Sequence, residues 1–365
     1  MKIAMLGTKG IPFPAGIENF VEQTGSRLAK RGHEVTVFVR PYVDVSESYR
    51  GMRTKRLPSV PTKHLDALTH TFLGTLDVLW RDVDVVHYHA LGPSVFSGIP
   101  RLRGRATIAH VHGLDWQRAK WSSFAKACLR GGELASVYFP QRTISISRTL
   151  KDYLEARYRK PVDYVPTGVR IGESCPPNEI RRLGLEEGSY ILFLSRLVPE
   201  KGCHYLIEAY KALAPGKKLV IAGPSSHSDD YAEPLKAHAS RDIIFTGAVS
   251  GALLDELYAN AYLYVLPSEI EGLPHALLEG MSFGRCVLAS DIEPNLEALG
   301  GCGVTFRSQD VSDLTEKLRA LLDNPDLVRE RASGARERVR EHYSWEHVVD
   351  RLEQIYAQCA NGVRA

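Results

Sequence analysis

The sequence predicts an α/β protein made of two Rossmann-like, doubly wound domains that face a central cleft. Short apolar runs alternate with amphipathic stretches along most of the 365 residues. The alternation stops in a stretch rich in proline and glycine and then starts again. The net charge also divides the chain, with +12 over residues 1–170 and −9 over the remainder. Strands that alternate with helices are typical of βαβ units around a parallel sheet, and this length suits two domains.

The first domain begins with a short apolar strand at 2–7 that ends at a glycine. A helix is expected over 16–31, because Ile17, Phe20 and Leu28 fall mostly on one face at helical spacing. Further strands are expected at 34–39, 84–89, 106–112 and 143–147, where apolar and β-branched residues gather.

A polar stretch at 169–188, punctuated by proline and glycine, is expected to be a linker. The strand pattern then resumes. The expected strands of the second domain are 190–195, 218–223, 242–247, 262–268, 286–290 and 303–306. From 310 to 358 the chain is predicted to be mostly helical, with breaks at Asn324-Pro325 and around 343–345. Ligands of doubly wound sheets bind outside the carboxyl ends of the strands, so we expect the site in the cleft between the two domains.

Composition excludes several classes of protein. Charged residues make up 24% and aromatic residues 8% of the chain, which is typical of globular proteins and not of disordered ones. No run approaches the roughly 18 apolar residues of a membrane span, and the N-terminus lacks the pattern of a signal peptide. The six cysteines are widely spaced, without a C-x-x-C pair, which argues against a disulfide framework. A cytoplasmic protein is therefore expected.

The loop and helix at 268–281 carry two carboxylates that are candidates for binding a ligand. Glu271 is expected on the loop and Glu279 one to two turns into the helix, with Pro274 in the first helical turn. A helix start at the end of a strand offers free N–H groups to a phosphate. The carboxylates would repel that phosphate, so they are better suited to bind hydroxyls. The alternative is a polar loop followed by a solvated helix face.

A second segment, 195–202, follows directly on a predicted strand. Arg196 is expected at the carboxyl end of that strand, and Lys201 near the next helix. An arginine and a lysine at this place suit a diphosphate, the arginine as a two-pronged donor and the lysine as a point charge. The alternative is a solvated basic pair.

The first loop is rich in glycine but does not follow the dinucleotide-binding pattern. Its glycines lie at Gly7, Gly10 and Gly16, not as G-x-G-x-x-G. The second strand ends in Arg40 and not in the acid that binds the ribose of NAD. The glycine spacing and the missing acid disfavour a dehydrogenase. That class of enzyme stays open because Arg40 suits a 2′-phosphate.

Four histidines stand at the ends of two predicted strands: His87, His89, His110 and His112. Alternation places His110 and His112 on one side of their strand, with His112 nearer the cleft. A zinc site is conceivable, but no cysteine or aspartate completes a ligand set, and such histidines are often structural. The triplet 82–84 resembles a D-x-D motif but precedes its strand, so we expect it to be solvated and expect no bound metal.

These motifs together resemble family 4 glycosyltransferases of the GT-B fold. The resemblance is carried by E-x7-E at Glu271 and Glu279, by S-R-L-V-P-E-K-G at 195–202, by the first loop and by the V-H-G at 111–113. It covers nearly the whole chain. The segments GTKGIP, HVHGLDWQR and SEIEGLPHALLEGMSFG are similar to a bacterial subgroup assigned to cell-wall and exopolysaccharide synthesis, with rhamnosyltransferase-like members.

The resemblance implies a retaining sugar transfer from a nucleotide-diphosphate sugar, without a metal or other cofactor, to a glycan or lipid-linked acceptor. It divides the chain into an acceptor domain, 1–168, joined by the last helix, 345–365, and a donor domain, 189–344. The implied catalytic residues are His112, Arg196, Lys201 and Glu271. The implied donor-binding residues are Gly16, Arg196, Lys201, Val249, Glu271, Gly272, Leu273 and Glu279.

Within that resemblance, Glu271 contacts the donor sugar and Glu279 the ribose hydroxyls, and Val249 holds the base by its backbone. Two positions depart from the family pattern, Ala15-Gly16 for Gly-Gly and Thr167-Gly168 for Asn-Gly. The first departure leaves the path of the first loop in question, but neither change removes a side chain assigned to chemistry. A non-catalytic sugar-nucleotide-binding protein and a GT-B epimerase remain as alternatives.

Residues 98–131 combine positive charge with apolar side chains, a pattern that suits an anionic membrane surface. One acid, Asp115, stands against seven basic residues: Arg101, Arg103, Arg105, Arg118, Lys120, Lys126 and Arg130. The interleaved apolar residues are Leu102, Leu114, Trp116, Trp121, Phe124 and Leu129. We expect peripheral contact with the inner face of the plasma membrane. The alternative is a solvated basic face, and nucleic acid is disfavoured because no recognition motif accompanies the patch.

Overall fold

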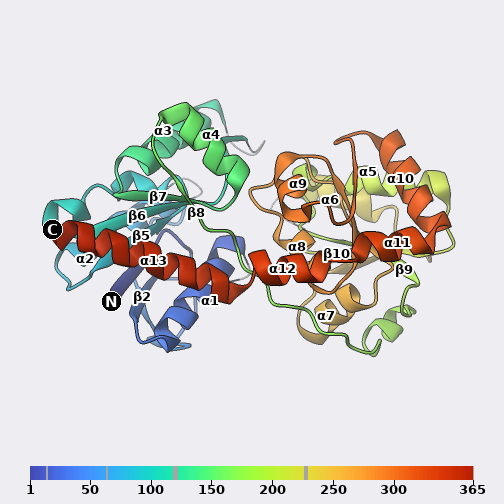
Figure 1. Cartoon of the computed structure of the whole chain (residues 1–365), viewed down its shortest axis with the longest axis horizontal. Helices are drawn as coiled ribbons and strands as arrows, with labels where there is room; N and C mark the ends of the chain where they lie inside the picture. Colours follow the sequence, from blue (N-terminus) through green and yellow to red (C-terminus); the bar gives the residue numbers. More distant parts are fainter. Residues whose placement is uncertain (14, 63–64, 118–121, 226–228, 365) are drawn as a thin grey trace. The chain divides into compact units, whose positions relative to one another are not determined.

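The computed structural model describes residues 1–13, 15–62, 65–117, 122–225 and 229–364. The chain divides into two compact units (Figure 1). The first unit comprises Met1–Gly168 and Trp345–Ala365, and the second comprises Val169–Ser344. Each unit contains its own sheet and its own hydrophobic core, as the alternating sequence pattern predicts.

The sheet of the first unit has the strand order β3-β4-β2-β1-β5-β6-β7-β8. All neighbouring strands are parallel except β3, which runs antiparallel to β4. The strands are β1 (Lys2–Leu6), β2 (Glu34–Val39), β3 (Ser48–Tyr49), β4 (Met52–Arg56), β5 (Val85–His89), β6 (Ala106–Val111), β7 (Arg142–Ser145) and β8 (Asp163–Tyr164). The sequence predicts five of these strands and misses β3, β4 and β8, which lie at the two edges and are short or polar.

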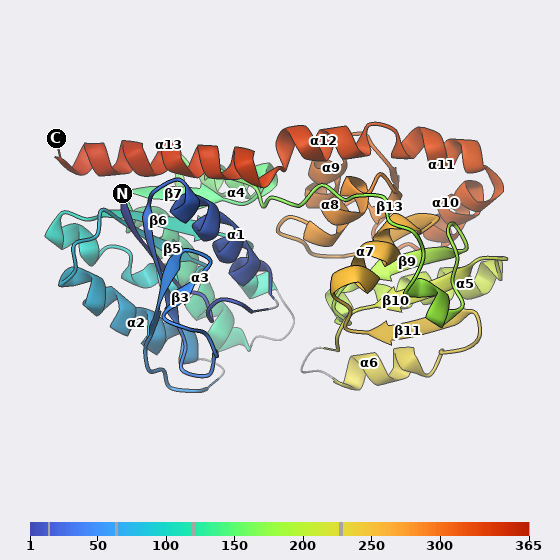
Figure 2. The same ribbon diagram turned by 90° about the horizontal axis from the view of Figure 1, so that it is seen from below.

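Helices cover both faces of this sheet. They are α1 (Gly16–Lys30), α2 (Asp66–Leu79), α3 (Ser123–Tyr138), α4 (Arg148–Tyr158) and α13 (Trp345–Arg364), with 3-10 turns at Pro93–Phe96, Pro100–Arg103 and Asp115–Gln117. One core lies beneath α1 and α13, and a smaller core includes Val78 of α2. In both views α13 lies alongside α1 (Figures 1 and 2).

Helix α13 returns to the first unit because one of its faces is apolar. Val348, Val349, Leu352, Ile355 and Tyr356 recur at helical spacing and are fully buried in the core with α1 and the sheet.

Ion pairs also join the two helices. Arg31 of α1 contacts Glu346 at 2.9 Å, Asp350 at 2.6 Å and Glu353 at 2.5 Å. The last helix therefore completes the first unit, although more than 300 residues of chain separate it from α1.

The second sheet is entirely parallel, in the order β11-β10-β9-β12-β13-β14. Its strands are β9 (Tyr190–Leu194), β10 (Lys218–Ala222), β11 (Ile243–Gly247), β12 (Leu263–Leu266), β13 (Cys286–Ser290) and β14 (Val304–Phe306). The helices are α5 (Cys203–Leu213), α6 (Asp229–Lys236), α7 (Gly251–Ala259), α8 (His275–Ser282), α9 (Glu293–Leu299), α10 (Val311–Asp323), α11 (Pro325–Ala332) and α12 (Ala335–His342), with 3-10 turns at Ile180–Leu183 and Pro199–Lys201. All six predicted strands are present, within one or two residues of the expected bounds.

The stretch 169–188, expected to be a linker, belongs to the second unit. The N–H groups of Asn178, Glu179 and Ile180 donate to Oε2 of Glu256 at 2.8, 2.7 and 3.2 Å. Ile180 and Leu185 are fully buried. The prolines and glycines indicate correctly that the stretch is irregular, but a buried carboxylate from α7 and two apolar side chains hold it against the unit.

The helical tail breaks where the sequence predicts, at Asn324 and around Tyr343. Gly334 adds a break that the sequence analysis missed, since it takes a left-handed conformation at φ +79° between α11 and α12. Among the described residues, no helix has both the length and the apolar character that crossing a membrane requires.

Candidate functional site

Two loops of the second unit meet at the carboxyl ends of neighbouring strands. Strands β9 and β12 pair in parallel, so the loops that follow them, 195–202 and 267–274, leave the same edge of the sheet. The N–H of Glu269 donates to the carbonyl of Glu200 at 2.9 Å. Tyr205, at the start of α5, donates its hydroxyl to Oε1 of Glu269 at 2.8 Å. The loops form one connected structure.

Gly202 lies at the closest approach of these loops. Its φ is +67°, and a Cβ atom there would lie 2.0 Å from the carbonyl oxygen of Pro267. Both observations require glycine, because other residues adopt this conformation at a cost and the added carbon would overlap backbone. The position of Gly202 therefore fixes the preceding Lys201 against the second loop.

Lys201 and Glu271 form an ion pair across the loops. The Lys201 Nζ atom lies 2.5 Å from Oε1 of Glu271, and the Ser268 hydroxyl donates to the same oxygen at 2.7 Å. The two charged side chains are only 15% and 8% exposed. The other oxygen of Glu271, Oε2, has no hydrogen-bond partner among the described residues and is available to accept from a ligand hydroxyl.

Arg196 follows β9 at its carboxyl end and is exposed, without an ion pair in the described part of the chain. The backbone just before Arg196 packs closely against the chain that follows the neighbouring strand β10. Gly223, which follows β10, has φ +141°, and a Cβ there would lie 1.9 Å from the carbonyl oxygen of Ser195. Of the two cations expected to bind a diphosphate, Arg196 is thus unpaired and Lys201 is already paired with a carboxylate.

Glu279 lies on α8 with two partners. Its Oε2 accepts from the buried hydroxyl of Tyr258 at 3.1 Å, and its Oε1 lies 3.4 Å from Nε2 of His275, one turn earlier. Burial alone raises the pKa of Glu279, but His275, Tyr258 and Arg170 outweigh it, so the net pKa is lowered. Burial likewise lowers the pKa of His275, but Glu279 reverses the effect and raises it.

Helix α8 begins one residue later than the sequence predicts. Pro274 is the N-cap, with φ −78° and ψ 86°, and not a residue of the first turn. No side chain caps the helix, so its first N–H groups are available to an anionic ligand. Gly272 is half-buried and Leu273 is buried in the preceding loop. Val249 is half-buried in the loop between β11 and α7.

Gly16 and His112 lie in the first unit. Gly16 begins α1 and is exposed, and a Cβ there would meet nothing within 4 Å. The preceding loop is held by Glu18, whose buried Oε1 accepts from the N–H of Lys9 at 2.9 Å. The open space beside Gly16 is compatible with a ligand near its backbone.

His112 follows β6 and is half-buried. Its Nε2 lies 3.1 Å from Nδ1 of His89, and its ring stacks on that of His110 with centroids 4.1 Å apart. Burial lowers the pKa of His112 to about 3. His112 is therefore a neutral hydrogen-bonding group at pH 7.

Arg40, which kept a dehydrogenase open, is buried and paired. Its Nη1 atom lies 2.5 Å from Oδ2 of Asp66 and donates to the hydroxyl of Tyr42 at 2.9 Å. This arrangement does not favour a 2′-phosphate ligand. At the opposite end of the strands, Asp84 accepts from the N–H of Lys2 at 2.8 Å, and Asp82 pairs with the Lys2 side chain at 2.6 Å. The D-x-D triplet is accounted for by these contacts.

Only some side chains of the basic segment 98–131 are exposed to solvent in the part of the chain that the structure describes. Arg118, Lys120 and Trp121 lie outside the described residues. Leu102 and Phe124 are 86% and 80% exposed. Trp116, in contrast, donates its indole N–H to the buried Glu133 at 2.6 Å.

A further aromatic side chain joins the segment from outside it. Trp80, at the end of α2, is 79% exposed, and the guanidinium of Arg103 lies 4.9 Å from its ring centroid. The sequence analysis missed Trp80 because 22 residues separate it from Leu102.

Three other residues of the second unit were also missed: Ser268, Tyr258 and His275. The i,i+4 spacing of His275 and Glu279 is a signal that the sequence contains. Tyr258 comes from α7 and gives no such signal. The structure brings Lys201, Glu271 and Ser268 together in the second unit, and His89, His110 and His112 together in the first.

Models of known protein families match residues in both units. The model described as "Glycosyltransferase Family 4" matches residues 14–173, and "Glycosyl transferases group 1" matches residues 177–338. Glycogen synthase of Mycobacterium tuberculosis is 32% identical over 408 residues, covering 100% of this chain and 96% of that protein. D-inositol 3-phosphate glycosyltransferase of Gordonia bronchialis is 26% identical over 412 residues, covering 99% and 87%.

Two solved structures resemble the fold. Sucrose-phosphate synthase from Thermosynechococcus elongatus superposes with a TM-score of 0.84 at 22% identity, covering 98% of both chains. Anabaena HepE, solved in complex with UDP and glucose, gives 0.83 at 17% identity and covers 98% of this chain and 100% of its own. The two α/β units with parallel sheets thus constitute the GT-B fold, as the sequence predicts.

Proposed function

This chain belongs to the glycosyltransferases described as group 1 and family 4, and from that premise we propose the reaction that it catalyses. It moves a sugar from a nucleotide-diphosphate sugar to a glycan or lipid-linked acceptor in bacterial surface polysaccharide synthesis, with retention of configuration and without a metal ion. The observation that carries the proposal is the buried Lys201–Glu271 pair, beside the start of α8, at the joined ends of β9 and β12.

The leaving nucleoside diphosphate gains negative charge as the bond to the sugar breaks. Arg196, Lys201 and the uncapped N-terminus of α8 supply positive potential at the same edge of the sheet. Glu271 holds Lys201 in place, so the ammonium group is ordered before the donor binds. Preorganised positive groups take the part that a divalent ion plays in other phosphate chemistry.

The carboxylates bind hydroxyls of the donor. Glu271 accepts from the sugar through Oε2, and the backbone of Gly272 and Leu273 lies beside it. Glu279, oriented by Tyr258 and His275, accepts from the ribose.

The remaining contacts with the donor are proposed to be made mostly by backbone. Val249 holds the base through its backbone, and the backbone of Gly16 approaches the phosphates.

The transfer step needs no protein nucleophile. The acceptor hydroxyl attacks the anomeric carbon on the face that the diphosphate leaves, a phosphate oxygen takes the hydroxyl proton, and the carbon–oxygen bond to the phosphate breaks. Configuration is retained because the new bond forms on the face of the old one. Hydrolases that retain configuration instead use two facing carboxylates at a set separation. His112 contributes a neutral imidazole near the reacting sugar.

Anabaena HepE has been solved in complex with UDP and with UDP-glucose, which makes UDP-sugars the first donors to test on this chain. A thermal-shift panel of UDP, GDP and dTDP sugars identifies the donor, since a ligand at 100 times its dissociation constant stabilises by about 2.7 kcal/mol. Transfer to an acceptor supports the proposal. Binding without any turnover indicates a binding protein, and conversion of the donor sugar without acceptor indicates an epimerase.

The absence of a catalytic metal has its own test. Turnover of chelator-dialysed protein is expected to be the same with and without added Mg²⁺ or Mn²⁺. A rate that depends on either ion would contradict the assignment of the diphosphate to Arg196, Lys201 and α8.

The exposed side chains Trp80, Leu102 and Phe124, together with Arg101 and Arg103, support peripheral contact with an anionic membrane. Each basic residue near such a surface contributes on the order of 1 kcal/mol, and apolar side chains add burial in the headgroup region. Contact with the membrane would bring the protein to a lipid-linked acceptor.

A further inference from the structure

We propose that His87, His89 and His110 form a binding site for a divalent transition metal, best suited to Zn²⁺, in the core of the first unit. The inference is independent of the proposed sugar transfer. The site lies among these histidines and uses none of the residues assigned to the diphosphate.

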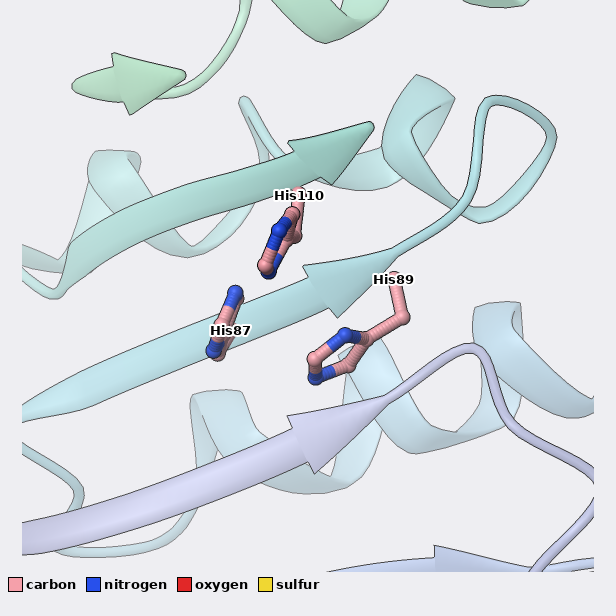
Figure 3. Close-up of side chains that lie close together, drawn as sticks. All are labelled: His87, His89 and His110. Atoms are coloured by element: carbon pink, nitrogen blue, oxygen red, sulfur yellow. The ribbon is translucent and has the colours of Figure 1, made fainter. Parts of the chain in front are cut away.

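The sheet itself brings the three rings together. His87 and His89 alternate on β5 and therefore face the same side of the sheet. His110 lies on the neighbouring parallel strand β6, in register with His89. One ring nitrogen from each residue lies within 4.8 Å of the others. Figure 3 shows the three rings grouped on these two strands.

Several ring nitrogens of the three residues lack other partners. Nε2 of His87 and Nε2 of His89 make no hydrogen bond in the described structure, and neither does either ring nitrogen of His110. All three residues are 0% exposed. Buried polar atoms without partners are rare in folded proteins, because burial costs them their bonds to water. A metal ion bound among them supplies the missing interaction to all three rings at once.

The opposite nitrogens of two rings are already held. Nδ1 of His87 lies 2.7 Å from the hydroxyl of Tyr356, and Nδ1 of His89 lies 3.1 Å from Nε2 of His112. Histidines that bind metals usually donate their second N–H in this way, which fixes the tautomer and orients the ring. Here it leaves the Nε2 lone pairs of His87 and His89 unpartnered and able to bind a metal ion.

The chemistry of the ligands selects the metal. Neutral imidazole suits Zn²⁺, Ni²⁺, Co²⁺ and Cu²⁺, whereas Mg²⁺ and Ca²⁺ require oxygen ligands. Zn–N bonds of about 2.0–2.1 Å in a tetrahedron place nitrogens roughly 3.4 Å apart. The ring nitrogens lie within 4.8 Å of one another in this structure, so the rings must move closer together to bind the ion. Three histidines leave a fourth coordination position for water, and the neighbouring His112 is half-buried.

The test uses the full chain, dialysed against a chelator and titrated with Co²⁺ as a spectroscopic probe and with Zn²⁺. One equivalent of Zn²⁺ by elemental analysis, a visible Co²⁺ spectrum of tetrahedral type and a rise in Tm are expected. His87→Gln and His110→Gln should each lower metal affinity by at least about 10-fold. The matched control is His70→Gln, since His70 is equally buried in the same unit on α2 but outside the cluster.

Circular dichroism of each variant shows whether it folds. If a cluster variant does not fold, the result on the wild-type chain decides. Uptake by the wild type of less than about a tenth of an equivalent at saturating Zn²⁺ overturns the proposal. So does folded His110→Gln protein that binds as tightly as the wild type, or an equal loss of affinity in His70→Gln.

Discussion

The ammonium group of Lys201 lies 2.5 Å from a carboxylate oxygen of Glu271, and both side chains are largely buried, although 70 residues separate them in the chain. The sequence predicts Lys201 near the start of a helix and Glu271 on a loop, but it does not predict the pair. This pairing means that neither residue acts alone: Glu271 orders the cation that faces the diphosphate, and Lys201 leaves Glu271 one free oxygen. Substitution of either is therefore expected to affect the function of both.

Lys201→Ala is expected to reduce turnover by roughly 10²-fold or more, because it removes a preorganised positive charge from the leaving group and leaves Glu271 buried without its partner. Steady-state kinetics with saturating donor measures the effect. Lys211→Ala is the matched control, since Lys211 lies on α5 in the same unit and contacts His238 at the surface. Turnover in Lys201→Ala within twofold of the wild type would remove Lys201 from the site.

The two carboxylates are expected to separate nucleotide binding from sugar transfer. Glu279→Ala should weaken binding of the bare nucleoside diphosphate by about 10-fold, as expected for the loss of hydrogen bonds to a charged group. Glu271→Ala should reduce transfer of the sugar more than it weakens that affinity, which it changes only through Lys201. Titration calorimetry with the nucleotide compares the two variants directly. Equal nucleotide affinity in Glu279→Ala and wild-type protein would show that the ribose is bound elsewhere.

The His275–Glu279 pair is expected to make stability depend on pH. The pKa of His275 is raised above 6.5 in the folded state, so its contribution is complete below pH 6.5 and is lost as the pH rises through the raised value. The pKa of Glu279 is lowered below 4.5, so its contribution is present above pH 4.5 and is lost as the pH falls through the lowered value. Both contributions are complete only between these limits.

Glu279→Gln should therefore destabilise the protein most between about pH 4.5 and 6.5, and less above the raised pKa of His275. Denaturant unfolding at a series of pH values measures this difference, and NMR titration should show a lower pKa for His275 in the variant. A destabilisation that is constant from pH 5 to 9 would argue against the ion pair.

Gly202→Ala is expected to lower stability by at least about 1–3 kcal/mol, because the residue has positive φ and its new methyl group would overlap the Pro267 carbonyl. Gly216→Ala is the control, since no atom lies within 4 Å of the corresponding Cβ. Thermal unfolding compares the two. If Gly202→Ala unfolds at the temperature of Gly216→Ala, the two loops are not held together as described.

Contact with the membrane is expected to depend on the exposed apolar side chains. Leu102→Ser combined with Phe124→Ser should reduce co-sedimentation with anionic vesicles several-fold, and high salt should reduce it further. Leu296→Ser is the control, because Leu296 is an exposed leucine of the second unit. The proposal fails if wild-type protein does not bind at low salt, or if the double variant binds equally well.

Much of the fold follows from local sequence patterns. The apolar runs EVTVFV and CVLAS coincide with β2 and β13 at both ends, because strands buried on both faces need almost continuous apolar side chains. The short edge strand β8 and the polar β4 carry no such pattern and were missed. The stretch 169–188 looks like a linker in composition, but the carboxylate of Glu256, almost 80 residues away, attaches it to the second unit.

Local sequence was sufficient to place particular residue types at the ends of the strands. The ends of strands and the starts of helices are marked by the few residues around them. Arg196 could therefore be located at a strand end, Lys201 near a helix start, Glu271 on a loop and Glu279 on a helix without the structure. Which of these groups meet depends on the tertiary fold. The pairing of β9 with β12 brings Lys201 to Glu271, and the register of β5 with β6 groups the histidines. Pairing and register depend on contacts between distant segments, whose free energy no local pattern records.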